Sequence, residues 1–130
     1  MREALYYERE NDKVRCLLCP HRCLITEGKG GICRQRKNHG GKLIAEGYGR
    51  VSSIAMDPIE KKPLYHFYPS SSILSAGGLH CNLRCSFCQN WHIAHREKPV
   101  RFIPPEDLVE IALSCGGIGI AFTYNEPVIW

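Results

Sequence analysis

The feature that most limits how this chain can fold is the placement of its cysteines. Seven of the eight lie in two short groups, within residues 16–33 and 81–88, and Cys115 stands apart. Met1 is followed by charged residues rather than a secretory leader, so we expect a cytoplasmic protein with reduced thiols. Compact groups of reduced thiols favour metal binding over disulfides. The sequence therefore predicts two metal sites and one spare thiol.

The composition is that of an ordinary globular protein. Hydrophobic residues make up 44% of the chain and charged residues 23%, which predicts a folded core. The net charge of +4 is mild, and Lys and Arg form no stripe typical of a nucleic-acid surface. No apolar run approaches the roughly 18 residues that cross a membrane. We therefore expect neither a nucleic-acid partner nor a membrane, and about one domain in 130 residues.

The second half of the chain has the pattern of a strand, a loop, a helix and a second strand. The apolar run 73–76 ends in two glycines, which predicts a buried parallel strand. Residues 105–114 predict an amphipathic helix with proline in its first turn, and 118–122 predict a second buried strand. The predicted fold class is therefore α/β, with a right-handed crossover.

The first half of the chain is harder to assign. Residues 2–9 predict one or two helical turns, and 42–47 and 50–55 predict a small hairpin or two edge strands. Three prolines keep the following stretch irregular. We place the boundary near residue 69, which divides the chain into a cysteine-rich extension, 1–69, and a second part, 70–130.

The second cysteine group has the spacing C-x3-C-x2-C, formed by Cys81, Cys85 and Cys88 directly after the first predicted strand. Iron–sulfur clusters are usually held by four thiolates, so three leave one iron open. Cys115 follows a helix of about 15 Å, which places it out of reach, and we expect it to be a small buried core residue. The alternative is a zinc site completed by a nearby histidine, with candidates His80, His92 and His95.

The first group has the spacing C-x2-C-x3-C-x9-C, formed by Cys16, Cys19, Cys23 and Cys33. Four thiolates satisfy the closed tetrahedral shell of a structural zinc, whose binding energy can fold a segment with few core residues. A second iron–sulfur cluster and free or redox-active thiols remain alternatives. His21 and His39 are near enough to substitute as ligands, but we expect both at the surface.

Several stretches resemble a known family. The segment Cys81-Asn82-Leu83-Arg84-Cys85-Ser86-Phe87-Cys88-Gln89-Asn90-Trp91 closely resembles the cluster loop of radical S-adenosylmethionine (SAM) enzymes related to pyruvate formate-lyase activating enzymes. Residues 16–20, 57–69 and 123–127 look like the radical SAM component of the AmmeMemoRadiSam system. The likeness spans nearly the whole chain. It departs at His80, where these proteins more often carry glycine.

This resemblance implies a fold, cofactors and a chemistry. The fold is the beginning of a partial (β/α) barrel, with about two strands present. Three cysteines hold a 4Fe-4S cluster whose fourth iron chelates SAM, and electron transfer then yields a 5′-deoxyadenosyl radical that abstracts hydrogen from a substrate. Phe87 matches the aromatic position beside the adenine, with plain loop packing as the alternative.

The stretch Thr123-Tyr124-Asn125-Glu126-Pro127 follows the second predicted strand. Related activating enzymes carry Gly-Gly-Glu-Pro here, and its backbone and acid contact the SAM ammonium group. This chain keeps Glu126 and Pro127 but has Tyr124 and Asn125 for the glycines. The resemblance thus implies that Glu126 and Asn125 bind the cofactor, the alternative being a solvated loop acid.

We therefore predict a radical SAM enzyme that acts on an unidentified protein or small molecule and needs an electron donor. The hard chemistry would belong to the cofactors, and no side chain is assigned as catalytic. The alternatives are a non-catalytic iron–sulfur or zinc module and a fragment of a glycyl-radical activating enzyme. Because only two barrel strands can be placed, we expect this chain to be a fragment that is inactive alone.

Overall fold

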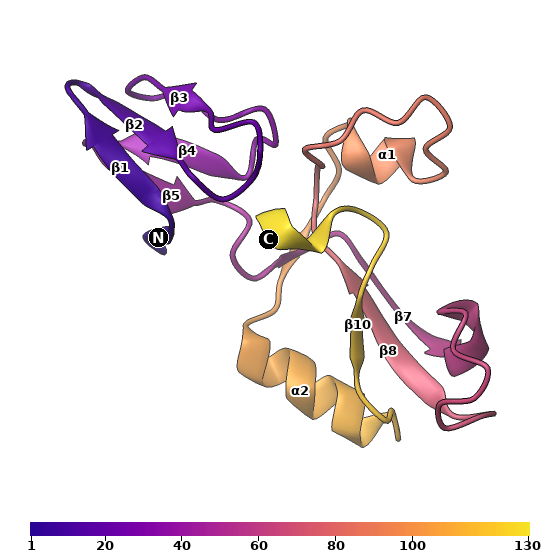
Figure 1. Cartoon of the computed structure of the whole chain (residues 1–130). Helices are drawn as coiled ribbons and strands as arrows, with labels where there is room; N and C mark the ends of the chain where they lie inside the picture. Colours follow the sequence, from indigo (N-terminus) through magenta and orange to yellow (C-terminus); the bar gives the residue numbers. More distant parts are fainter.

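The computed structural model describes all 130 residues and is mostly β. Its strands form four small sheets, accompanied by two α-helices and two short 3-10 helices (Figure 1). Every strand pair is antiparallel except β8 (Ser72–Gly77) with β10 (Ile120–Phe122). The predicted α/β class is therefore wrong, and the structure contains no barrel, because one parallel pair in a three-stranded sheet cannot close on itself.

The N-terminal sheet consists of β1 (Tyr7–Glu10), β2 (Lys13–Cys16) and β3 (Leu24–Ile25). Glu10 pairs with Lys13, so Asn11 and Asp12 form a two-residue turn, with Asn11 at a φ of 57°. Asparagine tolerates this left-handed conformation, which suits tight hairpins. A hairpin therefore replaces the helix predicted over residues 2–9.

A second hairpin joins β4 (Arg36–His39) to β5 (Lys42–Ala45) through Gly40 and Gly41, whose φ angles are 62° and 71°. Two successive positive φ angles define a turn that favours a glycine pair. The strand predicted at 42–47 is therefore real, but its partner precedes it. Of the two predicted alternatives, the hairpin of 42–47 with 50–55 is wrong, whereas an edge strand is present, since β5 is one of only two strands in its sheet.

Residues 50–58 form two strands that reach into the second half of the chain. The short β6 (Arg50–Val51) pairs with β9 (Arg101–Phe102), and β7 (Ser53–Pro58) pairs with β8 (Ser72–Gly77). The strand β7 lies before the boundary proposed near residue 69, yet it belongs to the sheet that follows. The division at that boundary remains a prediction.

The unit predicted for the second half is present. The helix α2 (Pro105–Ser114) connects β8 to β10 (Ile120–Phe122), and these two strands run parallel, with Leu74 opposite Ile120. Leu108 and Ala112 of the helix pack against Leu74 and Ala76 of the sheet. The remaining elements are α1 (Trp91–Ala94), η1 (Ile59–Lys61) and η2 (Pro127–Ile129).

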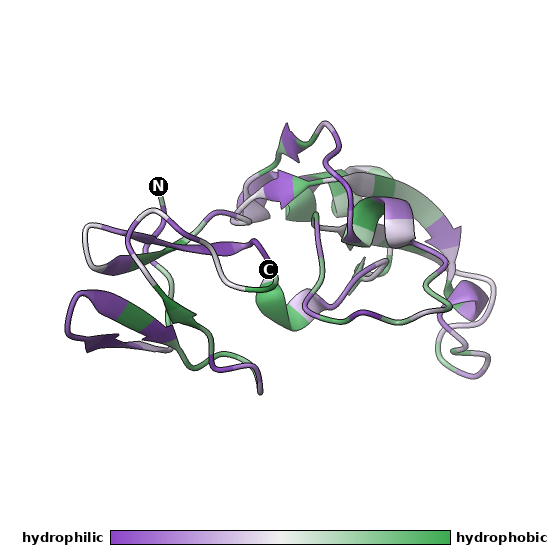
Figure 2. Cartoon of the chain, turned by 90° about the horizontal axis from the view of Figure 1, so that it is seen from above, coloured by the Kyte–Doolittle hydropathy of each residue, from purple (hydrophilic) through white to green (hydrophobic).

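Two separate apolar clusters stabilise the chain, one inside the N-terminal hairpins and one between α2 and the second sheet. The hairpins are largely hydrophilic along their length, with short apolar segments (Figure 2). The chain's C-terminus lies between the two regions (Figure 1), and Trp130 Nε1 donates to Gly47 O at 2.7 Å. None of the helices is long and apolar enough to cross a membrane.

Asp57 anchors the turn that follows β7. Its buried carboxylate accepts hydrogen bonds from Lys61 Nζ at 2.8 Å, Lys62 Nζ at 2.9 Å and Ser75 Oγ at 2.6 Å. Burial alone would raise the pKa of Asp57, but these three donors and the two ammonium charges hold it well below its usual range. The segment from Asp57 to Lys62 is therefore attached to the central strand β8 through the hydrogen bond of Ser75.

Candidate cluster-binding site

The carboxyl ends of the parallel strands β8 and β10 meet at one edge of the second sheet, and each continues into a loop with a predicted site residue. Gly77 and Gly78 make this close approach possible. A Cβ on Gly77 would lie 2.7 Å from Thr123 O, and one on Gly78 would lie 3.2 Å from the Trp130 ring. Only a residue without a side chain permits such packing at position 77.

Cys81, Cys85 and Cys88 border one open hollow of about 320 Å³ between these loops. Cys81 is buried, Cys88 is half-buried and Cys85 is exposed. Leu83 N donates to Cys81 Sγ at 3.4 Å. No three Cys, His, Asp or Glu side chains of the structure already meet around a point suited to a metal ion, so ligation requires the thiols to turn inward. The donor set and its common hollow fit a three-thiolate cluster site.

Cys115 does not border this hollow, in agreement with the expectation that it is not a fourth ligand. It caps the C-terminal end of α2 and is exposed. The expectation of a buried core residue is wrong, because α2 ends on the solvent side at Leu113, Ser114 and Cys115. His95 does border the hollow, whereas His80 and His92 do not.

Asn125 and Glu126 border the same hollow as the three cysteines. Asn125 Nδ2 donates to His80 O at 2.6 Å, which ties the second loop to the first. Glu126 Oε1 accepts from Val128 N at 3.1 Å and so caps η2. Phe87 is 84% exposed and does not border the hollow, so its placement beside an adenine stays a prediction.

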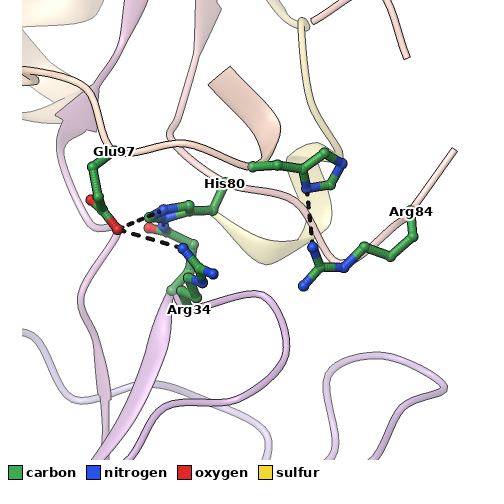
Figure 3. A network of polar contacts seen from close by, with 6 residues as sticks. Arg34, His80, Arg84 and Glu97 are labelled. Atoms are coloured by element: carbon green, nitrogen blue, oxygen red, sulfur yellow. Dashed lines mark hydrogen bonds and ion pairs between the residues drawn. The ribbon is translucent and has the colours of Figure 1, made fainter. Parts of the chain in front are cut away.

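The sequence offered His80 only as an alternative zinc ligand, and its contacts with distant segments were not foreseen. His80 is buried, with a φ of 64°, in the left-handed region that favours glycine. Gln35 Nε2 lies 2.9 Å from Nδ1, and Glu97 Oε1 lies 3.1 Å from Nε2 and 3.6 Å from Arg34 (Figure 3). An amide nitrogen only donates, so Nδ1 accepts and Nε2 carries the proton. Burial lowers the pKa of His80, which favours this neutral form.

Residue 80 has the left-handed backbone conformation that glycine would adopt freely, and contacts from both sides hold its imidazole. On the far side of the loop, Arg84 Nη1 lies 3.5 Å from His95 Nδ1 (Figure 3).

Cys16, Cys19, Cys23 and Cys33 border a second hollow, which the N-terminal hairpins line together with Asn82 and Ile129. The structure thus brings together all four members of the first cysteine group. Burial raises the pKa of the Cys33 thiol, and the other three thiols raise it further. His21 borders this hollow as well, whereas His39 is exposed on β4, as expected for a surface residue.

Comparison with known proteins identifies a relative whose own name assigns it no function. The chain is 49% identical over 134 residues to the uncharacterized protein MJ0808 of Methanocaldococcus jannaschii, an alignment that covers all of this chain and 40% of that protein. The chain thus spans less than half the length of the curated relative that it matches. No family model and no solved structure matches it.

Proposed function

We propose that this chain binds a 4Fe-4S cluster through Cys81, Cys85 and Cys88 and holds SAM beside it, as a radical SAM protein. The observation that carries the proposal is the single hollow that the three thiols share with Asn125 and Glu126. Two loops some 40 residues apart in sequence supply thiolate ligands on one side and a carboxylate on the other. The resemblance of the cysteine loop to radical SAM enzymes supports the same assignment.

The three cysteines, Glu126 and Asn125 would have different functions in this site. Three thiolates leave one iron of a 4Fe-4S cluster without a protein ligand, and that cluster, when bound, supplies the electron for reductive cleavage of SAM. Glu126 uses Oε1 for its cap, so Oε2 can accept from an ammonium group. Asn125 holds the two loops together through its bond to His80 O, which fixes the distance between ligands and carboxylate.

The site is exposed enough to admit an electron donor, SAM and a substrate. Cys85 is exposed and Cys88 half-buried, so an electron donor can approach the cluster edge at that side. The hollow is open, which leaves room for SAM and for a substrate that would be a protein or a small molecule. We therefore place both partners at the face between the cysteine loop and residues 124–126.

A second candidate function is a non-catalytic zinc module. His95 borders the hollow with the three cysteines, and three thiolates with one imidazole complete a tetrahedral zinc shell. The two functions differ in their dependence on this histidine. A zinc site would lose affinity in a His95→Ala variant, whereas a three-thiolate cluster would keep its iron.

The test is anaerobic reconstitution with iron and sulfide, followed by EPR of the reduced protein with and without SAM. We expect a 4Fe-4S signal that changes on SAM addition, disappears in Cys81→Ala, Cys85→Ala and Cys88→Ala, and persists in His95→Ala. Cys115→Ala is the matched control and should keep the signal. Zinc bound through these cysteines, with no cluster signal after reconstitution, would contradict the proposal.

A further inference from the structure

The hollow bordered by the four N-terminal cysteines is small and only partly open to solvent. Cys16 ends β2, Cys19 and Cys23 lie in the loop before β3, and Cys33 precedes β4. The cavity volume is about 10 Å³, close to the space that one water molecule requires. The four thiols line this space but do not yet meet around a point suited to a metal ion, so they would have to turn toward it; a space of this size has room for one ion and none for four irons and four sulfides.

Gly31 also lines this cavity, and its backbone lies close to Cys23 and Ile25. A Cβ at this position would lie 3.5 Å from Cys23 Sγ and 3.3 Å from Ile25 Cδ1. The second of these distances is tighter than ordinary van der Waals contact. A side chain at position 31 would therefore press on Ile25 and lie in ordinary contact with the Cys23 thiol.

Arg36 supplies an independent indication of a bound group. It borders the same hollow and is buried, and its Nε has no hydrogen-bond partner, although Nη1 donates to Leu5 O at 2.7 Å. A buried donor without an acceptor destabilises the fold, because it has lost its hydrogen bond to water. Four thiolates around a divalent ion carry a net charge of −2, so a metal-bound sulfur would accept from this N–H and the guanidinium would offset part of the charge.

The hairpins also have little other stabilisation. Their apolar cluster contains only five buried residues, one of which is a ligand candidate: Ala4, Val14, Cys16, Ile25 and Leu43. A core of this size rarely stabilises a fold without a disulfide or a metal. All eight cysteines are free, which leaves a metal as the natural cross-link.

We propose that Cys16, Cys19, Cys23 and Cys33 bind one zinc ion as a closed tetrathiolate site, and that this site anchors the loop carrying Cys81. The anchoring follows from two contacts on either side of Cys81. His21, between the second and third ligands, places Nε2 2.9 Å from Asn82 O, and Gln35, two residues after the fourth, lies 2.9 Å from His80 Nδ1. The zinc site does not depend on the radical SAM assignment.

The first test removes the competing thiols by using the full chain with Cys81→Ser, Cys85→Ser and Cys88→Ser. Elemental analysis should give one zinc per chain, and X-ray absorption should show four sulfurs at about 2.3 Å. Four irons with inorganic sulfide in this variant would overturn the single-ion site, as would a chain without metal after refolding in zinc. Neither readout involves a cluster at the second site.

The second test measures the anchoring by hydrogen exchange of the amides in residues 79–83 of the same variant. Removal of zinc with a chelator, or Cys23→Ser, should accelerate exchange there at least tenfold, whereas Cys115→Ser should leave it unchanged. Unchanged exchange after zinc loss would overturn the anchoring and leave the metal site intact. Failure of the radical SAM proposal alone would alter neither result.

Discussion

Gln35 Nε2 donates to His80 Nδ1 at 2.9 Å, and this bond joins the end of one cysteine group to the start of the other. Gln35 follows Cys33 by two positions and His80 immediately precedes Cys81. Both side chains belong to buried residues, 4% and 5% exposed, so the bond is shielded from water. The two groups are 48 residues apart from Cys33 to Cys81, yet they are held as neighbours.

Replacement of Gln35 by leucine should destabilise the chain by about 1–3 kcal/mol, because it leaves a buried ring nitrogen without its donor. Urea unfolding followed by circular dichroism measures the change. Arg34→Ala is the control, since Arg34 meets Glu97 at 3.6 Å between exposed side chains and such pairs contribute little. Equal losses in the two variants would show that the buried bond does not carry the effect.

The variants His80→Gly and His80→Ala distinguish the energetic cost of the backbone conformation at residue 80 from the contribution of the imidazole contacts. Both variants lose the bonds to Gln35 and Glu97, but only alanine keeps a Cβ at the observed φ of 64°. The glycine variant should therefore be more stable than the alanine variant by about 1 kcal/mol, measured as the difference in urea midpoints multiplied by the m-value. Identical stabilities would mean that the backbone at residue 80 is not strained.

Gly77→Ala should destabilise the sheet edge by about 1–3 kcal/mol, since the new methyl group meets Thr123 O at 2.7 Å and must displace the second loop. The shift should appear in thermal unfolding and in the amide NMR signals of residues 123–126. Gly119→Ala is the matched control, because a Cβ there meets nothing within 4 Å and requires no unusual φ.

Glu126→Gln tests the proposed ammonium contact while keeping the cap on Val128. The glutamine carbonyl can still accept from Val128 N, but the charge is lost. Hydrogen bonds to charged groups contribute about 1.5–3 kcal/mol, so SAM affinity should fall roughly 10- to 100-fold in calorimetry on the reconstituted protein. Glu106→Gln, in the first turn of α2, should leave affinity unchanged.

The second half of the chain was predictable because its helix is ten residues long and amphipathic and its strands are continuous apolar runs bounded by glycines. The helix at 105–114 and the strands at 73–76 and 118–122 appear at or near their expected bounds, and their parallel pairing places both site loops at one edge. The spacing of Cys81, Cys85 and Cys88 likewise indicated a shared site, since loop cysteines this close necessarily lie near one another.

The first half was not predictable from periodicity. Its strands are two to six residues long and pair through turns whose signals, Asn11-Asp12 and Gly40-Gly41, lie between mostly polar residues. The α/β class failed for the same reason, because hairpins of this length carry little apolar alternation. The contacts of His80 were beyond sequence reasoning, since they depend on how distant segments pack.

Asp57→Asn should destabilise the chain at neutral pH by about 3 kcal/mol, because it removes the charge that pairs with Lys61 and Lys62 and leaves two ammonium groups beside a neutral amide. The pKa of Asp57 is lowered in the folded state, whereas an unfolded aspartate titrates near pH 3.9. The carboxylate therefore stabilises the fold fully above that pH, and its contribution declines as the pH falls toward the lower folded value.

The measurement is the difference in unfolding free energy between the wild-type chain and Asp57→Asn, in urea from pH 7 to pH 3. The difference should be constant above about pH 5 and shrink below about pH 4, while acid loss of metal affects both proteins equally. Lys62→Met, which replaces a side chain 15% exposed, should cost more than Lys61→Met, where the side chain is 60% exposed. A difference that grows on acidification would show that the carboxylate opposes folding.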